Sequence, residues 1–260
     1  MSEFIHYEVS DRIATITIDR PEKRNALSYA MYDAIRDYTA AADADPQVGA
    51  IILTAVPGQF CAGTDLTELH DVEPGTTGSD RVGHTDGRHW FLWDCSKPTI
   101  IAIDGPTAGL GVELATQGDL RIASTRARFS WIFVQRGLIP DTGAGTWLLP
   151  QQVGPQQAKR LVFSGEFISA EEAADIGFVL EVVEPEDLPA AARRLAESVC
   201  TGAPFAIKRA KELLNAAPSR TRDEHLNAHI EALTECQLSE DHKEGVAAFL
   251  SKRAPVFTGR

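Results

Sequence analysis

The chain has 260 residues, 43% of them hydrophobic, which is enough for one large domain or for one domain with an appendage. Its formal net charge of -12 argues against nucleic acid as the main partner, because binding to a phosphate backbone requires a basic face. The charge does not exclude a small phosphate-bearing ligand, since a few local cations are enough to bind one.

Short apolar strands alternate with helices up to about residue 185. "FIHYEVS" and "IATITID" predict a hairpin with its turn at Ser10 and Asp11. Ser28 is placed to cap a helix that carries Met31 and Ile35 on one face. "GAIILTAV" and "PTIIAIDG" are typical of buried strands, and "LRIAS", "ARFSW" and "FVLEVV" predict further ones. This alternation predicts an α/β fold.

The rest of the chain has a purely helical pattern. Thr221 and Glu224 are spaced as a capping box, which predicts the start of a long helical run that reaches Lys252. We therefore predict fold class α/β, with an α/β core over residues 1–190 and a helical carboxy-terminal region over residues 191–260.

Several common functional signatures are absent. "GLGVEL" has the first two glycines of GxGxxG but Leu114 in place of the third, and neither GxxxxGK[ST] nor GxSxG occurs. His225 and His229 have the spacing of a helical metal site, but "HLNAH" lacks the glutamate of HExxH. A solvated helix is therefore favoured over a metal site there.

The amino terminus and the cysteines bear on location. "MSEFIHYEVSDR" lacks the apolar stretch of a signal peptide, and no segment approaches about 18 uninterrupted apolar residues, so we expect no membrane partner. The four cysteines form no CxxC pair, which is typical of reduced thiols, and we expect a cytoplasmic protein.

Asp141 stands in an otherwise apolar and glycine-rich run, "FSWIFVQRGLIPDTGAG". An unpaired buried carboxylate is costly, and within about seven residues on either side only Arg136 could share its charge. Asp141 therefore either caps the helix expected between Gly143 and Leu149 or works with a group from elsewhere in the chain.

Two glycine-rich loops, "FCAGTDL" and "GPTAGLGVEL", each follow a buried strand and lead into a helix. Glycines at such junctions leave backbone N–H groups open to a ligand. Two loops that face each other could direct two donors at one oxygen and so form an oxyanion hole. For either loop taken alone, a tight turn without a ligand is the alternative.

Four segments, "RPEKRNALS", "FCAGTDL", "GPTAGLGVELATQGD" and "GLIPDTGAG", have the order and spacing of the enoyl-CoA hydratase/isomerase (crotonase) family, which the chain resembles along its whole length. "GLIPD" and the carboxy-terminal "EGVAAFLSKRAPVF" look most like the phenylacetyl-CoA ring-epoxide isomerase subgroup. The resemblance implies a crotonase-like spiral of ββα turns, with a helical carboxy-terminal oligomerisation region that builds homotrimers or dimers of trimers. It also implies an acyl-CoA substrate and no separate cofactor, since coenzyme A is part of the substrate.

The resemblance assigns an oxyanion hole and a first catalytic residue. The two donors fall on the backbone N–H groups of Thr64 and Leu110, and the first catalytic glutamate falls on Glu113. Leu110 would open a helix, whose dipole would add positive potential where negative charge develops. A first-turn glutamate that interacts only with the helix dipole is the alternative for Glu113.

The second glutamate of the hydratases falls on Phe133, and an aromatic ring cannot hold or activate water. Family members that move double bonds in dienoyl-CoA or ring substrates place an aspartate at the position of Asp141. The resemblance therefore implies that Glu113 and Asp141 form an acid/base pair, in which one removes a proton and the other returns one at a different carbon. The ring-epoxide isomerase subgroup lacks a carboxylate at the position of Glu113, so this chain combines features of both activities.

For coenzyme A, the resemblance points to two loops and to the helical tail of a neighbouring subunit, at Lys23, Arg24, Ala26, Ala62, Leu66, Phe249 and Lys252. Lys252 would face a phosphate, and a solvated helix end is the alternative for it.

Three functions stay open at this point. Enoyl-CoA isomerisation through an enolate is favoured, and an enoyl-CoA hydratase of fatty-acid β-oxidation that uses Glu113 alone is the first alternative. A non-catalytic acyl-CoA-binding or RNA-binding relative is the second. The presence of Glu113 weighs against a loss of catalysis, and the net charge of -12 weighs against RNA.

Overall fold

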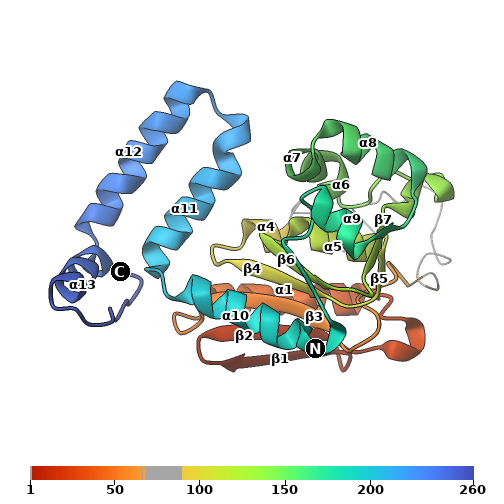
Figure 1. Cartoon of the computed structure of the whole chain (residues 1–260), viewed down its shortest axis with the longest axis horizontal. Coiled ribbons are helices and arrows are strands. Elements are labelled where there is room, and N and C mark those ends of the chain that lie inside the picture. Colours follow the sequence, from red (N-terminus) through yellow and green to blue (C-terminus); the bar gives the residue numbers. More distant parts are fainter. Residues whose placement is uncertain (1, 66, 68–89) are drawn as a thin grey trace.

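The computed structural model describes residues 2–65, 67 and 90–260, which form two sheets, surrounding helices and a helical arm (Figure 1). The larger sheet has the strand order β1-β2-β3-β4-β6-β9, and the smaller has the order β5-β7-β8. The strands are β1 Ile5–Ser10, β2 Ile13–Ile18, β3 Ala50–Ala55, β4 Thr99–Ile103, β5 Pro106–Ala108, β6 Leu120–Ser124, β7 Arg128–Ser130, β8 Ile168–Ser169 and β9 Glu181–Val183. The helices are α1 Tyr29–Ala44, α4 Phe91–Asp94, α5 Leu110–Gln117, α6 Ala144–Trp147, α7 Leu149–Val153, α8 Pro155–Ser164, α9 Ala170–Asp175, α10 Leu188–Cys200, α11 Pro204–Ala216, α12 Arg222–Leu238 and α13 Glu240–Leu250, with short 3-10 helices η1 Pro21–Lys23, η2 Ile132–Arg136, η3 Pro185–Asp187 and η4 Ala217–Ser219.

The larger sheet is parallel from β2 to β9, and β1 adds an antiparallel edge through a hairpin. The hairpin turn lies at Asp11 and Arg12, whose φ angles of 48° and 67° are those of a turn that matches the twist of the strands. The turn therefore begins one residue later than the sequence predicted, because Ser10 still pairs with Ile13.

Helices cover both faces of the larger sheet. Ile51 and Ile101 belong to the core that includes α1 and α5. Ile52 and Ile100, their neighbours along the strands, pack instead against α10. Since successive residues of a strand point to opposite faces, "AIILTA" and "TIIAI" are apolar throughout because both faces are buried. The expected division between residues 190 and 191 falls inside α10 and stays a prediction.

Two short strands depart from the sequence interpretation. β5 lies within the segment "GPTAGLG", which the pattern assigned to a loop, and pairs with β7 through Thr107 and Phe129. β8 was not expected at all, and it pairs with β7 through Ile168. Strands of two or three residues are too short to show a period, so only their partners reveal them.

The arm consists of α11, α12 and α13 and extends away from the sheets in Figure 1, where it is drawn in blue. The capping box of Thr221 and Glu224 is confirmed, since each side chain accepts a hydrogen bond from the other residue's backbone N–H. The long helical run is interrupted at Ser239, whose hydroxyl accepts a hydrogen bond from the His242 N–H at 3.0 Å and caps α13.

Lys211 anchors the arm to the core. Its side chain lies in α11 with a residue exposure of 9%, and its Nζ lies 2.7 Å from Asp119 Oδ2 and 3.0 Å from the Lys97 carbonyl. The same Asp119 oxygen accepts the Thr99 N–H at 2.7 Å, directly where β4 begins. The arm is thus fixed to the segment that follows α5.

We expect Lys211→Met to lower the free energy of unfolding by about 2–3 kcal/mol, because Asp119 loses its cation while it remains partly enclosed. Urea denaturation measures the change. Lys208→Met, on the exposed side of the same helix, is the control and should lie within about 0.5 kcal/mol of the parent. Equal losses in both variants would contradict the anchoring role.

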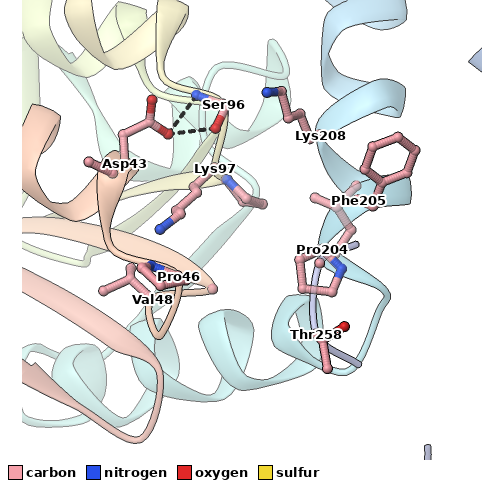
Figure 2. A pocket seen from close by; sticks show the side chains of 14 residues that line it. Asp43, Pro46, Val48, Ser96, Lys97, Pro204, Phe205, Lys208 and Thr258 are labelled. Carbon is pink, nitrogen blue, oxygen red and sulfur yellow. Dashed lines mark hydrogen bonds between the residues drawn. The ribbon is translucent and has the colours of Figure 1, made fainter. Parts of the chain in front are cut away.

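A recess of about 320 Å³ lies between the end of α1 and the start of α11. Figure 2 shows side chains that line it. Two of its polar side chains, Asp43 and Lys97, already have partners within the protein. Asp43 Oδ1 accepts the Ser96 N–H at 2.9 Å, and Lys97 Nζ donates to the carbonyl groups of Ala42 and Asp45. This recess marks the junction of arm and core and lies apart from the residues predicted to be catalytic.

In the described part of the chain, no helix is long and apolar enough to cross a membrane. Those residues also contain no group of three or more His, Cys, Asp and Glu side chains placed to hold a metal ion. All four cysteines are free thiols, and Cys61 and Cys95 are buried.

Candidate active site

The two glycine-rich loops meet backbone to backbone. The loop after β3 runs beside β5, because Cys61 and Thr107 form a bridge and the Ala108 N–H donates to the Cys61 carbonyl at 3.0 Å. A Cβ on Gly63 would lie 3.3 Å from the Ala108 oxygen and 3.7 Å from the Leu110 nitrogen. Only glycine, here with φ of 114°, allows this approach.

The predicted donors Thr64 and Leu110 keep their N–H groups open. Both neighbours of Thr64 are fixed, since the Leu27 N–H donates to the Gly63 carbonyl and the Asp65 N–H to the Leu27 carbonyl, each at 2.8 Å. Within residues 2–65, 67 and 90–260, neither the Thr64 nor the Leu110 N–H has an acceptor. Leu110 opens α5, at the positive end of the helix dipole. That both donors bind one oxygen stays a prediction.

Asp65 holds the first loop through its side-chain contacts. Its Oδ2 lies 2.8 Å from Arg20 Nη1, and its Oδ1 accepts the hydroxyl and the N–H of Thr67. These hydrogen bonds, with Thr67 the largest contribution, hold the pKa of the Asp65 carboxyl below its usual value. Asp65 is therefore ionised and structural.

Close contact between the loops makes Gly111 sensitive to substitution. A Cβ there would lie 2.5 Å from the Cys61 oxygen, so Gly111→Ala should push α5 off the first loop. We expect a loss of about 1–3 kcal/mol in stability and at least a tenfold loss, roughly, in kcat. Thermal melts and initial rates measure both. Gly245→Ala in α13, where the nearest atom lies 3.6 Å away, is the control: it should leave kcat unchanged and should not lower stability, because alanine favours a helix over glycine.

Glu113 is completely buried and its carboxylate has two hydrogen-bond donors. The Thr142 hydroxyl donates to Oε2 at 2.7 Å, and the Gly145 N–H donates to Oε1 at 2.9 Å. Burial raises the pKa of Glu113 to about 7, the charge of Asp141 adds to the rise, and the two donors oppose it. The alternative for Glu113, a first-turn glutamate that interacts only with the helix dipole, does not account for its burial, its two hydrogen bonds and its raised pKa.

Asp141 directly precedes Thr142 in the chain. Solvent reaches it at the protein surface, but enough protein surrounds its carboxyl that burial raises its pKa to about 6. The alternative of an N-cap is wrong: α6 begins at Ala144, its N-cap is Gly143, and the Thr142 hydroxyl accepts the Ala144 N–H at 3.3 Å. Asp141 is free for another role.

Aromatic side chains contribute to the core around the buried Glu113. Phe133 has a residue exposure of 5% and belongs to the same core cluster as Leu110 and Trp131. Tyr32 packs edge-on against Phe91, and its pKa is raised by burial first and then by the charges of Asp141 and Glu113. The surroundings of Glu113 are thus poor in water, whereas solvent reaches Asp141.

Sequence reasoning missed Thr142, Gly145 and Trp90. Trp90 Nε1 donates to the Thr142 carbonyl at 2.8 Å, which fixes the segment beside Asp141. A Cβ on Gly145 would lie 2.5 Å from Glu113 Oε1, so its N–H reaches the carboxylate only because it is glycine. The segment "DTGAG" offers a hydroxyl donor and small residues, but no pattern in the neighbouring sequence indicates that their partner is Glu113.

The structure brings together most of the loop residues predicted to bind coenzyme A. The Ala62 N–H donates to the Arg24 carbonyl at 3.1 Å, and the Ala26 N–H donates to the Lys23 carbonyl at 3.0 Å. Lys23 and Arg24 are exposed and available to an anion. Leu66 lies outside the described residues.

Phe249 and Lys252 lie on the arm and not beside these loops. Phe249 is in α13 with an exposure of 83%, and Lys252 follows that helix. Figure 1 shows α13 well separated from α5 within one chain. Any role of these two residues at the site therefore requires a second subunit.

A family model described as enoyl-CoA hydratase/isomerase matches residues 8–260. The chain belongs to the enoyl-CoA hydratase/isomerase family. It is 36% identical to the 1,2-epoxyphenylacetyl-CoA isomerase of Escherichia coli (strain K12), over 100% of both chains. It is also 37% identical to a probable enoyl-CoA hydratase of Rhodobacter capsulatus, over 98% of both chains. The relatives of this enoyl-CoA hydratase/isomerase thus carry the names of both activities.

Solved structures of the enoyl-CoA hydratase/isomerase family have the same fold. The crystal structure of an enoyl-CoA hydratase from Bacillus anthracis matches with a TM-score of 0.93 at 28% identity, over 99% of this chain and 100% of the other. The crotonase-like α/β fold that the resemblance implied is therefore confirmed, and the chain is an enzyme.

Proposed function

We propose that this enzyme moves the double bond of an enoyl-CoA thioester, with Glu113 and Asp141 as its acid/base pair. The observation that carries the proposal is the fully buried Glu113 carboxyl, which accepts hydrogen bonds from the Thr142 hydroxyl and the Gly145 N–H. Burial and the charge of Asp141 raise its pKa to about 7, and burial raises the pKa of Asp141 to about 6. Two carboxyl groups that titrate near neutrality suit proton removal and proton return at physiological pH.

The reaction proceeds through an enolate. One carboxylate removes a proton from a carbon conjugated to the thioester, and the electron pair moves onto the carbonyl oxygen. The N–H groups of Thr64 and Leu110 stabilise that negative charge. The other carboxyl group returns a proton at a different carbon, so the double bond shifts and no atom is gained. The cycle closes when the two carboxyl groups exchange a proton.

Hydration is the second candidate, favoured by the names of relatives such as the probable enoyl-CoA hydratase at 37% identity. Phe133 argues against it, because by the sequence resemblance it stands where hydratases carry a second glutamate, and an aromatic ring cannot orient water. A non-catalytic acyl-CoA-binding relative is disfavoured by Glu113, because a fully buried carboxyl with a raised pKa is costly to keep without a role.

A panel of short, long, branched and aromatic enoyl-CoAs, incubated in heavy-oxygen water and analysed by mass spectrometry, tests the proposal. Isomerisation gives a product of unchanged mass without label. Label in a 3-hydroxyacyl product would instead establish hydration. Tight binding of coenzyme A thioesters without turnover of any panel member would favour a binding protein.

In this proposal, the coenzyme A part of the substrate binds against Lys23, Arg24, Ala26 and Ala62. No further cofactor takes part, because the carboxyl groups transfer the protons. Phe249 and Lys252 of a neighbouring subunit complete this site in a homotrimer or a dimer of trimers, and we place the reaction in the cytoplasm. Exposed apolar side chains along the arm support the assembly: Leu226, Ile230, Leu233, Leu238, Phe249 and Leu250.

A further inference from the structure

Thr142, which lies beside the two carboxyl groups, is held through both its side-chain hydroxyl and its backbone carbonyl. Its hydroxyl donates to Glu113 Oε2 at 2.7 Å and accepts the Ala144 N–H at 3.3 Å. Its carbonyl oxygen accepts the indole N–H of Trp90 at 2.8 Å. Thr142 also directly follows Asp141, so one residue connects the supports of both carboxyl groups.

The two donors to Glu113 differ in what they can do. The Gly145 N–H, 2.9 Å from Oε1, can only donate. The Thr142 hydroxyl has one proton and two lone pairs, and it can rotate. Both suit the ionised carboxylate, which only accepts hydrogen bonds.

Proton transfer changes this requirement. Once Glu113 has taken a proton, its O–H needs an acceptor, and a buried O–H without one is costly. The Gly145 N–H cannot accept, whereas the Thr142 hydroxyl can turn and accept on its free lone pair.

We propose that Thr142 is a positioning residue that holds the Glu113 carboxyl in place in both of its protonation states. It acts through Glu113 and need not touch the substrate. The inference rests on the proposed function, because only a residue that gains and loses a proton in each turnover needs a partner of this kind.

Other groups also act on Glu113. Asp141 raises its pKa from the segment before α6, and Tyr32 lies within electrostatic reach of both carboxyl groups from α1, with Arg36 acting on Tyr32. Pro140 and Trp131 approach Gly145 with apolar atoms. Thr142 and Gly145 are thus the hydrogen-bond donors to the carboxylate from the described chain.

Thr142→Val and Thr142→Ser separate this role from packing. Valine keeps the shape of threonine but has no hydroxyl, whereas serine keeps the hydroxyl and loses a methyl group. We expect Thr142→Val to lower kcat by about tenfold or more, with KM within about twofold, because Glu113 is less well held. The acidic limb of its pH profile should move up by about one unit, since the lost donor favoured the ionised form. Thr142→Ser should keep kcat within about threefold and leave the limb in place.

A second measurement does not need a substrate. Carbon-13 NMR of protein labelled at the glutamate carboxyl carbon reports the Glu113 titration, which Glu113→Gln assigns by removing the signal. The Glu113 pKa should rise in Thr142→Val and stay unchanged in Thr142→Ser. Thr142→Ala replaces the valine variant if that protein does not fold, with the same expectation.

The inference is overturned if the valine and serine variants match each other in kcat, pH limb and titration. Loss of activity in Glu113→Gln, together with that result, would leave the proposed function standing and remove only the role of Thr142. Full activity in Glu113→Gln would instead remove the proposed function itself. The carboxyl titration would still show whether Thr142 holds Glu113.

Discussion

Glu113→Gln is expected to lower kcat by about 100-fold or more, while binding of the coenzyme A thioester changes little. Glutamine has the shape of glutamate and can still accept one of the two hydrogen bonds, from Thr142 or from Gly145. It cannot take up a proton from carbon. The loss should therefore fall on the chemical step and not on substrate binding.

Steady-state rates on the substrate found by the panel, with binding measured by calorimetry, test this expectation. Glu171→Gln on the exposed surface of α9 is the matched control and should leave kcat unchanged. A Glu113→Gln enzyme that keeps a tenth, roughly, of the parent rate or more would show that another group removes the proton.

The same substitution should change how stability depends on pH. The pKa of Glu113 rises from 4.5 to about 7 on folding, so between these values the folded state binds more protons than the unfolded state. Stability of the parent therefore falls as the pH rises through this window, because folding opposes ionisation. The free energy of unfolding of Glu113→Gln, relative to that of the parent, should therefore increase by on the order of 3 kcal/mol between about pH 4.5 and pH 7. Denaturant titrations across that range would measure this change.

Asp141→Asn is expected to abolish double-bond migration, again with intact binding of the thioester. Asparagine is similar in size but cannot exchange a proton, so the return of the proton at the second carbon fails. We expect a loss of about 100-fold or more in kcat, measured as isomer formed by mass spectrometry. Asp175→Asn, at the exposed end of α9, is the control that should turn over normally.

The result for Asp141→Asn also separates the two activities. A hydratase that works with Glu113 alone would keep its rate of water addition in this variant. An isomerase that uses both carboxyl groups would lose its rate in Asp141→Asn and in Glu113→Gln alike. Full isomerisation by Asp141→Asn would mean that the role assigned to Asp141 is wrong.

Local signals predicted most of the fold. The hairpin of β1 and β2 follows from alternating apolar residues, and α12 begins at Thr221 because its capping box needs only residues one turn apart. The structure differs from the sequence-based prediction where the sequence pattern was weak or where an element depends on residues far away in the chain. β8 has two residues and exists only through β7, and a single helical pattern hid the break at Ser239 because the residues on both sides favour helix.

The sequence by itself determined the family and the order of the two glycine-rich loops, and it singled out Glu113 and Asp141 as the carboxylates of interest. It could do so because each motif that carries the resemblance is a short run of neighbouring residues, and the order of the motifs is read directly from the chain. Tertiary structure alone decided the electrostatic state of Glu113. Its donors Thr142 and Gly145 come from 29 and 32 residues away, and their contact exists only because the turn before α6 packs against α5. Burial and hydrogen bonding, which together set a carboxyl pKa, are properties of neighbours in space, and no local pattern records them.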